Sequence, residues 1–181
     1  MSEAVDTPMV GGKRRLDKVL AVGFTEGLTD LEMDELRARR DLARAEREYL
    51  SLVRRLLQGR RDILHAELER RRSGEPAGEL VDRLSTILAD SPGPSRGEAP
   101  VVSLPEEELT LARRRVEKLL ADASLSDIEN ISEDKLEAAI ARVEDEERRV
   151  SETRGKVLSV HDTLQDELKE RYRAKVRDLP D

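Results

Sequence analysis

The sequence repeats itself at an offset of 100 residues without a gap, and this repeat constrains the fold more than any other feature. Apolar side chains recur every seven residues in two segments, at Leu36, Ala43, Leu50, Leu57 and Leu64, and at Leu136, Val143, Val150, Val157 and Leu164. A strict seven-residue apolar period lets two helices wrap around each other in a left-handed coil. We therefore predict an all-α protein built on two long coiled-coil helices.

The composition agrees with an elongated helical protein. Of the 181 residues, 40% are charged and 37% apolar, and the only aromatic residues are Phe24, Tyr49 and Tyr172. A compact domain usually has about half apolar and about a quarter charged residues. The core is therefore expected to be thin.

Capping and turn residues predict the boundaries of the first half. Residues 1–27 contain Pro8 and several glycines and are predicted to form a flexible arm with about one helical turn. Thr29 and Glu32 form a capping box that opens the first long helix, residues 28–73, and Gly74 ends it.

The second half begins with a segment rich in proline. Residues 74–104 are predicted to be a linker that contains one short helix, and Ser103 with Glu106 then opens a connecting helix, residues 105–124. The second long helix is predicted within residues 126–178, with Ser132 as its cap.

The two long helices are expected to pair antiparallel, as a hairpin. An antiparallel pair needs only a turn at one end, whereas a parallel pair needs a return path of about 65 Å. The intervening segment is long enough for either path, so the parallel arrangement stays open, but the hairpin is favoured.

The positions beside the apolar seam are unusually polar. Arg39, Glu46, Arg60 and Glu146 occupy the second seam position, so the coil is expected to be imperfect. A further apolar line follows the first helix at Leu42, Tyr49, Leu56 and Ile63. We expect this line to pack against the connecting helix, through Leu109, Val116 and Leu119; the alternative is a docking surface for a partner.

A polar stripe beside the seam is also repeated. In the first helix it consists of Ser51, Arg54, Gln58 and Asp62, and in the second of Glu147, Ser151, Arg154 and Asp162. The three- and four-residue spacings place each set on one side of a helix. Such neighbours are common on highly charged helices and often contribute little. Here serine, arginine and aspartate recur in the same phase, while other surface positions differ between the copies.

The residue types of the stripe suit a guanine nucleotide. Arginine can bond both O6 and N7 of guanine, carboxylates can accept hydrogen bonds from N1 and N2, and serine hydroxyls suit phosphate or ribose. Two antiparallel copies are related by an approximate two-fold axis. That symmetry suits a cyclic guanine dinucleotide, which is itself two-fold symmetric.

The stripe resembles the E-x3-S-x2-R-x3-Q-x3-D signature found on each long helix of the RsiG family of actinobacterial anti-sigma factors. The first copy departs from it at Arg47, in place of glutamate, and the second at Leu158, in place of glutamine. The resemblance implies that two molecules of cyclic di-GMP bind along the hairpin and license it to sequester the sporulation sigma factor WhiG, blocking transcription. Carried over by position, the ligand-binding residues are Ser51, Arg54, Gln58, Asp62, Glu147, Ser151, Arg154 and Asp162. A monomeric hairpin, alone or bound one to one with the sigma factor, is expected.

Other classes of function have little support in the sequence. The chain has no cysteine, its two histidines lack a metal-ligand pattern, and no phosphate loop or catalytic constellation is recognisable. We therefore expect no enzyme activity and no metal. The net charge of −7 argues against direct DNA binding, and the absence of a long apolar run indicates a cytoplasmic protein without membrane contact. The main alternative is a structural coiled-coil adaptor that binds no nucleotide.

Overall fold

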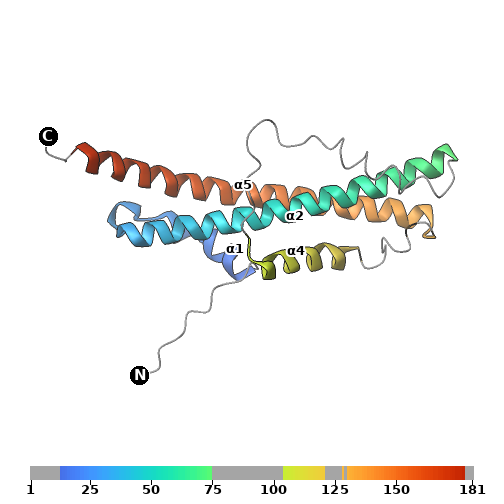
Figure 1. Ribbon diagram of the computed structural model, residues 1–181, viewed down its shortest axis with the longest axis horizontal. Helices are drawn as coiled ribbons and strands as arrows, with labels where there is room; N and C mark the ends of the chain where they lie inside the picture. Colours follow the sequence, from blue (N-terminus) through green and yellow to red (C-terminus); the bar gives the residue numbers. More distant parts are fainter. Residues whose placement is uncertain (1–12, 75–103, 121–127, 129, 178–181) are drawn as a thin grey trace, which may run out of the picture.

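Two long helices form the body of the molecule. The computed structural model describes residues 13–74, 104–120, 128 and 130–177. Helix α2 (Met33–Ser73) and helix α5 (Glu133–Arg177) lie side by side and run in opposite directions (Figure 1). The described residues contain no strand. The predicted all-α fold with an antiparallel hairpin is confirmed.

The seam between α2 and α5 is formed by the residues with the seven-residue period. All ten of them are between 0% and 1% exposed: Leu36, Ala43, Leu50, Leu57, Leu64, Leu136, Val143, Val150, Val157 and Leu164. Full burial of one leucine or valine side chain stabilises a fold by about 1.5–3 kcal/mol. The repeated apolar seam is therefore the main stabilising contact of the hairpin.

Helix α2 ends where the sequence predicts and begins later than expected. Gly74 adopts the left-handed conformation, with φ 73°, that closes a helix after Ser73. At the other end, the predicted capping box of Thr29 and Glu32 is wrong. Residues Leu28–Asp30 form the 3-10 turn η2, and the cap of α2 is Glu32, without a side-chain hydrogen bond.

The delayed start of α2 has a physical cause. Gly27 adopts the left-handed conformation, with φ 59°, and turns the chain before η2. Arg171 of α5 then donates hydrogen bonds to the carbonyl oxygens of Leu28 and Leu31. Because these carbonyls are bound by α5, the turn is held in place outside the helix.

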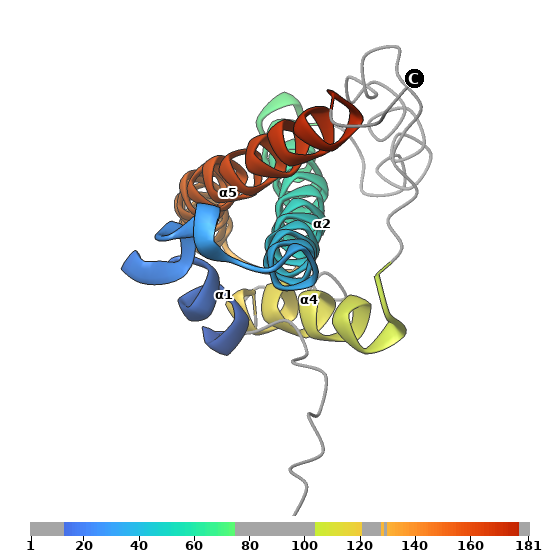
Figure 2. The same ribbon diagram turned by 90° about the vertical axis from the view of Figure 1, so that its left-hand side faces the viewer.

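Residues 13–27 differ from the predicted flexible arm. They form helix α1 (Lys13–Val19) and the 3-10 turn η1 (Val22–Thr25), and Val19 and Phe24 are buried. Figure 2, which looks along the hairpin, shows α1 and α4 (Glu106–Leu119) together on one side of the α2–α5 pair. Residues 1–12 lie outside the described residues.

A buried ion-pair cluster fastens α1 and α4 to the hairpin. Arg15 of α1 donates hydrogen bonds to Glu46 of α2 at 2.6 Å and to Glu108 of α4 at 2.7 Å and 2.9 Å. The three residues are 2%, 1% and 5% exposed. Burial raises the pKa of Glu46, although the bond to Arg15 opposes this effect. The polar seam position Glu46 therefore has a specific partner.

Two further polar seam positions, Arg39 and Glu146, also meet partners outside the hairpin. Arg39 donates a hydrogen bond to the carbonyl oxygen of Phe24 and lies 5.7 Å from the centre of its ring. Glu146 accepts a hydrogen bond from Arg115 of α4 at 2.7 Å. The predicted irregularity of the coil thus reflects binding of α1, η1 and α4.

Helix α4 packs against α2 as expected, with Val116 and Leu119 but not Leu109 in the shared core. Tyr49 and Val116 are buried, and Leu42, Leu56 and Ile63 are partly buried against the same core. The cap of α4 is Pro105, while Ser103 of the predicted capping box lies outside the described residues, as does the predicted short helix within residues 74–104.

Helix α5 begins at the predicted cap. The backbone N–H of Lys135 donates to Oγ of Ser132 at 3.4 Å, and α5 continues to Arg177. None of the helices in the described ranges has an apolar stretch long enough to span a bilayer.

Candidate functional site

The polar stripe lies on the flank of the seam opposite α1 and α4. On α2, Glu46 faces Arg15 of α1, whereas Ser51 and Arg54 follow the other side of the seam residue Leu50 at 100° per residue. The α1–α4 side is covered by packed side chains, so among the described elements the stripe lies on the face that α1 and α4 leave free.

The two copies of the stripe meet across the hairpin. Nε of Arg154 on α5 donates a hydrogen bond to Oγ of Ser51 on α2 at 2.8 Å. Nε2 of Gln58 on α2 donates to Oε1 of Glu147 on α5 at 2.6 Å. Residues that are distant in sequence therefore form one continuous polar surface.

Glu147 is the centre of a local network. Its Oε2 accepts a hydrogen bond from Arg61 at 2.8 Å, and its Oε1 lies 3.6 Å from Nε of Arg54. Nε of Arg54 is itself buried without a hydrogen-bond partner. The Glu147 side chain is 13% exposed, so this carboxylate is held by several donors at the edge of the seam.

The remaining stripe residues contact neighbours on their own helix or face solvent. Asp62 accepts hydrogen bonds from Arg61, and these bonds raise the pKa of Arg61 above its ordinary value. Asp162 lies 3.1 Å from His161 and its side chain is 61% exposed. Ser151 is exposed. The other five predicted residues make contacts that join the two helices: Ser51, Arg54, Gln58, Glu147 and Arg154.

The 100-residue offset relates contacts as well as residues. The 100-residue offset relates the Ser51–Arg154 contact to the pair Ser151 and Arg54. In the structure this second pair is not bonded in the same way, because Arg54 is directed to Glu147 instead. The approximate two-fold axis passes between these two pairs.

The two departures from the repeated pattern, Arg47 and Leu158, occupy the positions that the 100-residue offset relates to a single contact in the other half. Applying the offset to Gln58 and Glu147 gives Leu158 and Arg47, so the hydrogen bond of 2.6 Å in one half has no equivalent in the other. Both helices have changed at the same place along the hairpin. The stripe therefore has two unlike halves.

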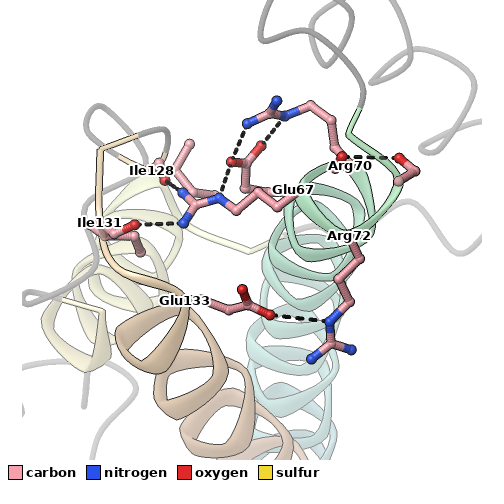
Figure 3. Close-up of polar contacts among 8 residues, drawn as sticks. Glu67, Arg70, Arg72, Ile128, Ile131 and Glu133 are labelled. Carbon is pink, nitrogen blue, oxygen red and sulfur yellow. Dashed lines mark hydrogen bonds and ion pairs between the residues drawn. The ribbon is translucent and has the colours of Figure 1, made fainter.

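Two arginines missed by the sequence analysis clamp the ends of the hairpin. Arg71 of α2 donates to the carbonyl oxygens of Ile128 and Ile131 at 2.6 Å, in the turn that precedes α5 (Figure 3). Arg171 binds the carbonyls of Leu28 and Leu31 in the same manner. These residues also follow the 100-residue offset, and that offset was the signal that could have identified them.

The described residues contain no group of three or more side chains suited to hold a metal ion. The stripe instead offers guanidinium, hydroxyl, amide and carboxylate groups on one side of the hairpin. Such groups bind by hydrogen bonds and charge, which fits recognition of a polar, anionic ligand.

Comparison with known protein families gives one match. Residues 23–88 match the model of the RsiG-like family. This agrees with the family that the stripe resembles, and the matched range contains the first copy of the stripe but not the second. No curated protein matches the chain.

Proposed function

We propose that this chain is an anti-sigma factor whose hairpin binds cyclic di-GMP along the polar stripe and, when loaded, sequesters the sigma factor WhiG. The family match over residues 23–88 supports the anti-sigma function. The observation that carries the nucleotide site is the direct contact of the two stripe copies, Arg154 with Ser51 at 2.8 Å.

The symmetry of the stripe supports a cyclic dinucleotide as ligand. Arg54 and Arg154 are related by the offset and flank the approximate two-fold axis. Each guanidinium can pair with the O6 and N7 edge of one guanine. A ligand with two guanines related by two-fold symmetry can therefore use both helices at once.

Arg54 offers a guanidinium that a ligand can reach. Its Nε is buried 3.6 Å from Oε1 of Glu147, while 39% of its side chain is exposed. The exposed part of the guanidinium can donate charge-assisted hydrogen bonds to a guanine or phosphate oxygen.

The ligand would control the sigma factor by linkage. A partner that contacts both the protein and the nucleotide binds the loaded hairpin more tightly. The same coupling requires the partner to tighten nucleotide binding by an equal factor. Cyclic di-GMP is then the regulatory ligand, with two molecules bound per hairpin, as the resemblance implies. The loaded hairpin binds WhiG one to one and does not contact DNA.

A structural coiled-coil adaptor is the second candidate. The observation in its favour is that several stripe residues already bind each other, as Gln58 binds Glu147. An adaptor has no need of a nucleotide, so it predicts that cyclic di-GMP changes neither stability nor partner binding.

Titration calorimetry with cyclic di-GMP tests the nucleotide site. We expect Arg54→Ala and Arg154→Ala each to weaken binding by about 1–3 kcal/mol, by analogy with arginine–guanine contacts in DNA recognition. Arg113→Ala is the matched control, because Arg113 is exposed on α4, on the covered side of the hairpin, and its loss removes the same charge. Unchanged affinity in both stripe variants would overturn the proposal.

The sigma-factor function is tested separately by co-purification with purified WhiG. Retention of WhiG only when cyclic di-GMP is present is the expected result. Equal retention with and without the nucleotide would show that the ligand does not license the complex.

A further inference from the structure

The two halves of the stripe differ in their chemistry. We call one the Glu147 half and the other the Arg47 half. The Glu147 half contains Arg54, Gln58, Arg61, Asp62, Glu147 and Ser151. The Arg47 half contains the residues related by the offset, Arg154, Leu158, His161, Asp162, Arg47 and Ser51. The first has two guanidiniums and two carboxylates, and the second has two guanidiniums and one carboxylate.

The carboxylate of the Glu147 half is well placed to accept hydrogen bonds. Glu147 is held by Gln58 at 2.6 Å and Arg61 at 2.8 Å, and only 13% of its side chain is exposed. Asp62 is 24% exposed beside it. Guanine has N–H donors at N1 and N2, which such carboxylates accept; adenine lacks both donors.

The Arg47 half lacks that acceptor. A guanidinium, Arg47, stands in the position of the glutamate, and an aliphatic side chain, Leu158, stands in that of the glutamine. No hydrogen bond or ion pair within the described part of the chain engages the half-buried Arg47 side chain. The carboxylate that remains in this half, Asp162, is 61% exposed. A guanidinium donates only, so it suits a phosphate and cannot accept from N1 or N2 of guanine.

We propose that Arg47 and Leu158 are specificity-determining residues that make the two halves read the nucleotide differently. The Glu147 half reads guanine through carboxylates at N1 and N2 as well as through Arg54 at O6 and N7. The Arg47 half keeps the contact of Arg154 with O6 and N7 and holds phosphate with Arg47, so it discriminates less strongly against adenine. This inference rests on the proposed function, because it concerns the same cyclic-dinucleotide site.

Calorimetry with three cyclic dinucleotides tests the inference: cyclic di-GMP, the mixed cyclic GMP–AMP and cyclic di-AMP. A factor of about 10 in the dissociation constant is the scale of one good base contact. For the wild-type chain we expect the mixed ligand to lose less than this factor relative to cyclic di-GMP. We expect cyclic di-AMP to lose more than this factor.

The decisive variant restores the repeated pattern in the Arg47 half. Arg47→Glu with Leu158→Gln is expected to raise the discrimination against the mixed ligand to more than about 10-fold. The matched control changes the other half in the opposite sense: Gln58→Leu with Glu147→Arg should lower the discrimination against cyclic di-AMP. Helical circular dichroism checks that both variants are folded.

The outcomes separate the inference from the proposed function. Equal discrimination by the wild-type chain and by both folded double variants, with cyclic di-GMP still bound, overturns the inference alone. No binding of cyclic di-GMP by the wild-type chain overturns the proposed function, and the inference falls with it.

Discussion

The two ends of the hairpin use the same clamp in different electrostatic surroundings. At the tip, Arg71 binds Glu67 at 2.6 Å and the carbonyls of the turn before α5. At the opposite end, Arg171 binds Glu167 at 2.8 Å and the carbonyls of η2. The duplicated geometry is therefore intact at both ends, although the stripe between them has diverged.

The clamps differ in burial and charge. Glu67 is 0% exposed and also binds Arg70 at 2.8 Å, whereas Glu167 is 22% exposed. The hydrogen bonds from Arg70 and then Arg71 lower the pKa of Glu67, against the effect of burial. One repeated motif has thus become a buried ionic cluster at the tip and a partly exposed pair at the other end.

Breaking the buried clamp should have the largest effect on stability. Arg71→Ala removes one partner of Glu67 and leaves two carbonyl groups of the turn without their donor. Loss of one member of a buried ion pair costs about 3–5 kcal/mol. We expect a loss near the lower limit, measured by urea unfolding, because Arg70 still holds Glu67. A loss below about 1 kcal/mol would contradict the assignment of this cluster as a structural clamp.

Neutralising the buried carboxylate should have a smaller effect that depends on pH. Glu67→Gln weakens the charge-assisted hydrogen bonds and is expected to cost about 2 kcal/mol at neutral pH. The folded pKa of Glu67 lies below its ordinary value of 4.5, so its contribution is present above that value and is lost as the pH falls through the lowered pKa.

The wild-type advantage over Glu67→Gln should therefore shrink in acid, as measured by urea unfolding from neutral pH to well below about 4.5. A difference between the two proteins that stays constant over this range would show that the charge of Glu67 is not responsible.

The exposed clamp should matter less. Arg171→Ala removes a pair whose members are 21% and 22% exposed, so we expect a loss of about 1 kcal/mol. Measured beside Arg71→Ala under the same conditions, this variant isolates the contribution of burial. Equal losses at both ends would remove the distinction between the clamps.

The helix caps next to the clamps should show the smallest effect. Ser132→Ala removes the side-chain acceptor that caps α5 and is expected to cost about 0.5–1 kcal/mol, measured by thermal unfolding. Glu32→Ala is the control at the start of α2, where the cap makes no side-chain hydrogen bond. A cost at Glu32 as large as that at Ser132 would argue against a capping role for the serine.

Local patterns predicted the hairpin because periodicity reports directly on a buried face. The seven-residue period identified ten fully buried residues of the seam, and the same repeat placed Ser51 and Arg154 on one surface. The α1–α4 side was harder to predict, since Arg15 finds Glu46 and Glu108 at separations of 31 and 93 residues. No local pattern encodes such a contact.

The site could be predicted in composition but not in detail. The sequence indicated which residues share the stripe, yet it did not show that Arg54 turns to Glu147 while Arg154 turns to Ser51. That choice depends on which carboxylate lies across the seam. The repeat could have identified Arg71 and Arg171 as equivalent residues. Their acceptors are backbone carbonyl oxygens, which every residue has, so the sequence does not indicate which ones they bind.

Thermal unfolding with and without cyclic di-GMP tests most directly whether the two stripe copies form one ligand site. A ligand selective for the folded state stabilises it by about 2.7 kcal/mol at 100 times its dissociation constant. We expect cyclic di-GMP to raise the Tm of the wild-type chain, and to raise it less in Arg54→Ala and in Arg154→Ala, which change one helix each. No increase for the wild-type chain, or an increase that only one of the two variants reduces, would contradict this expectation.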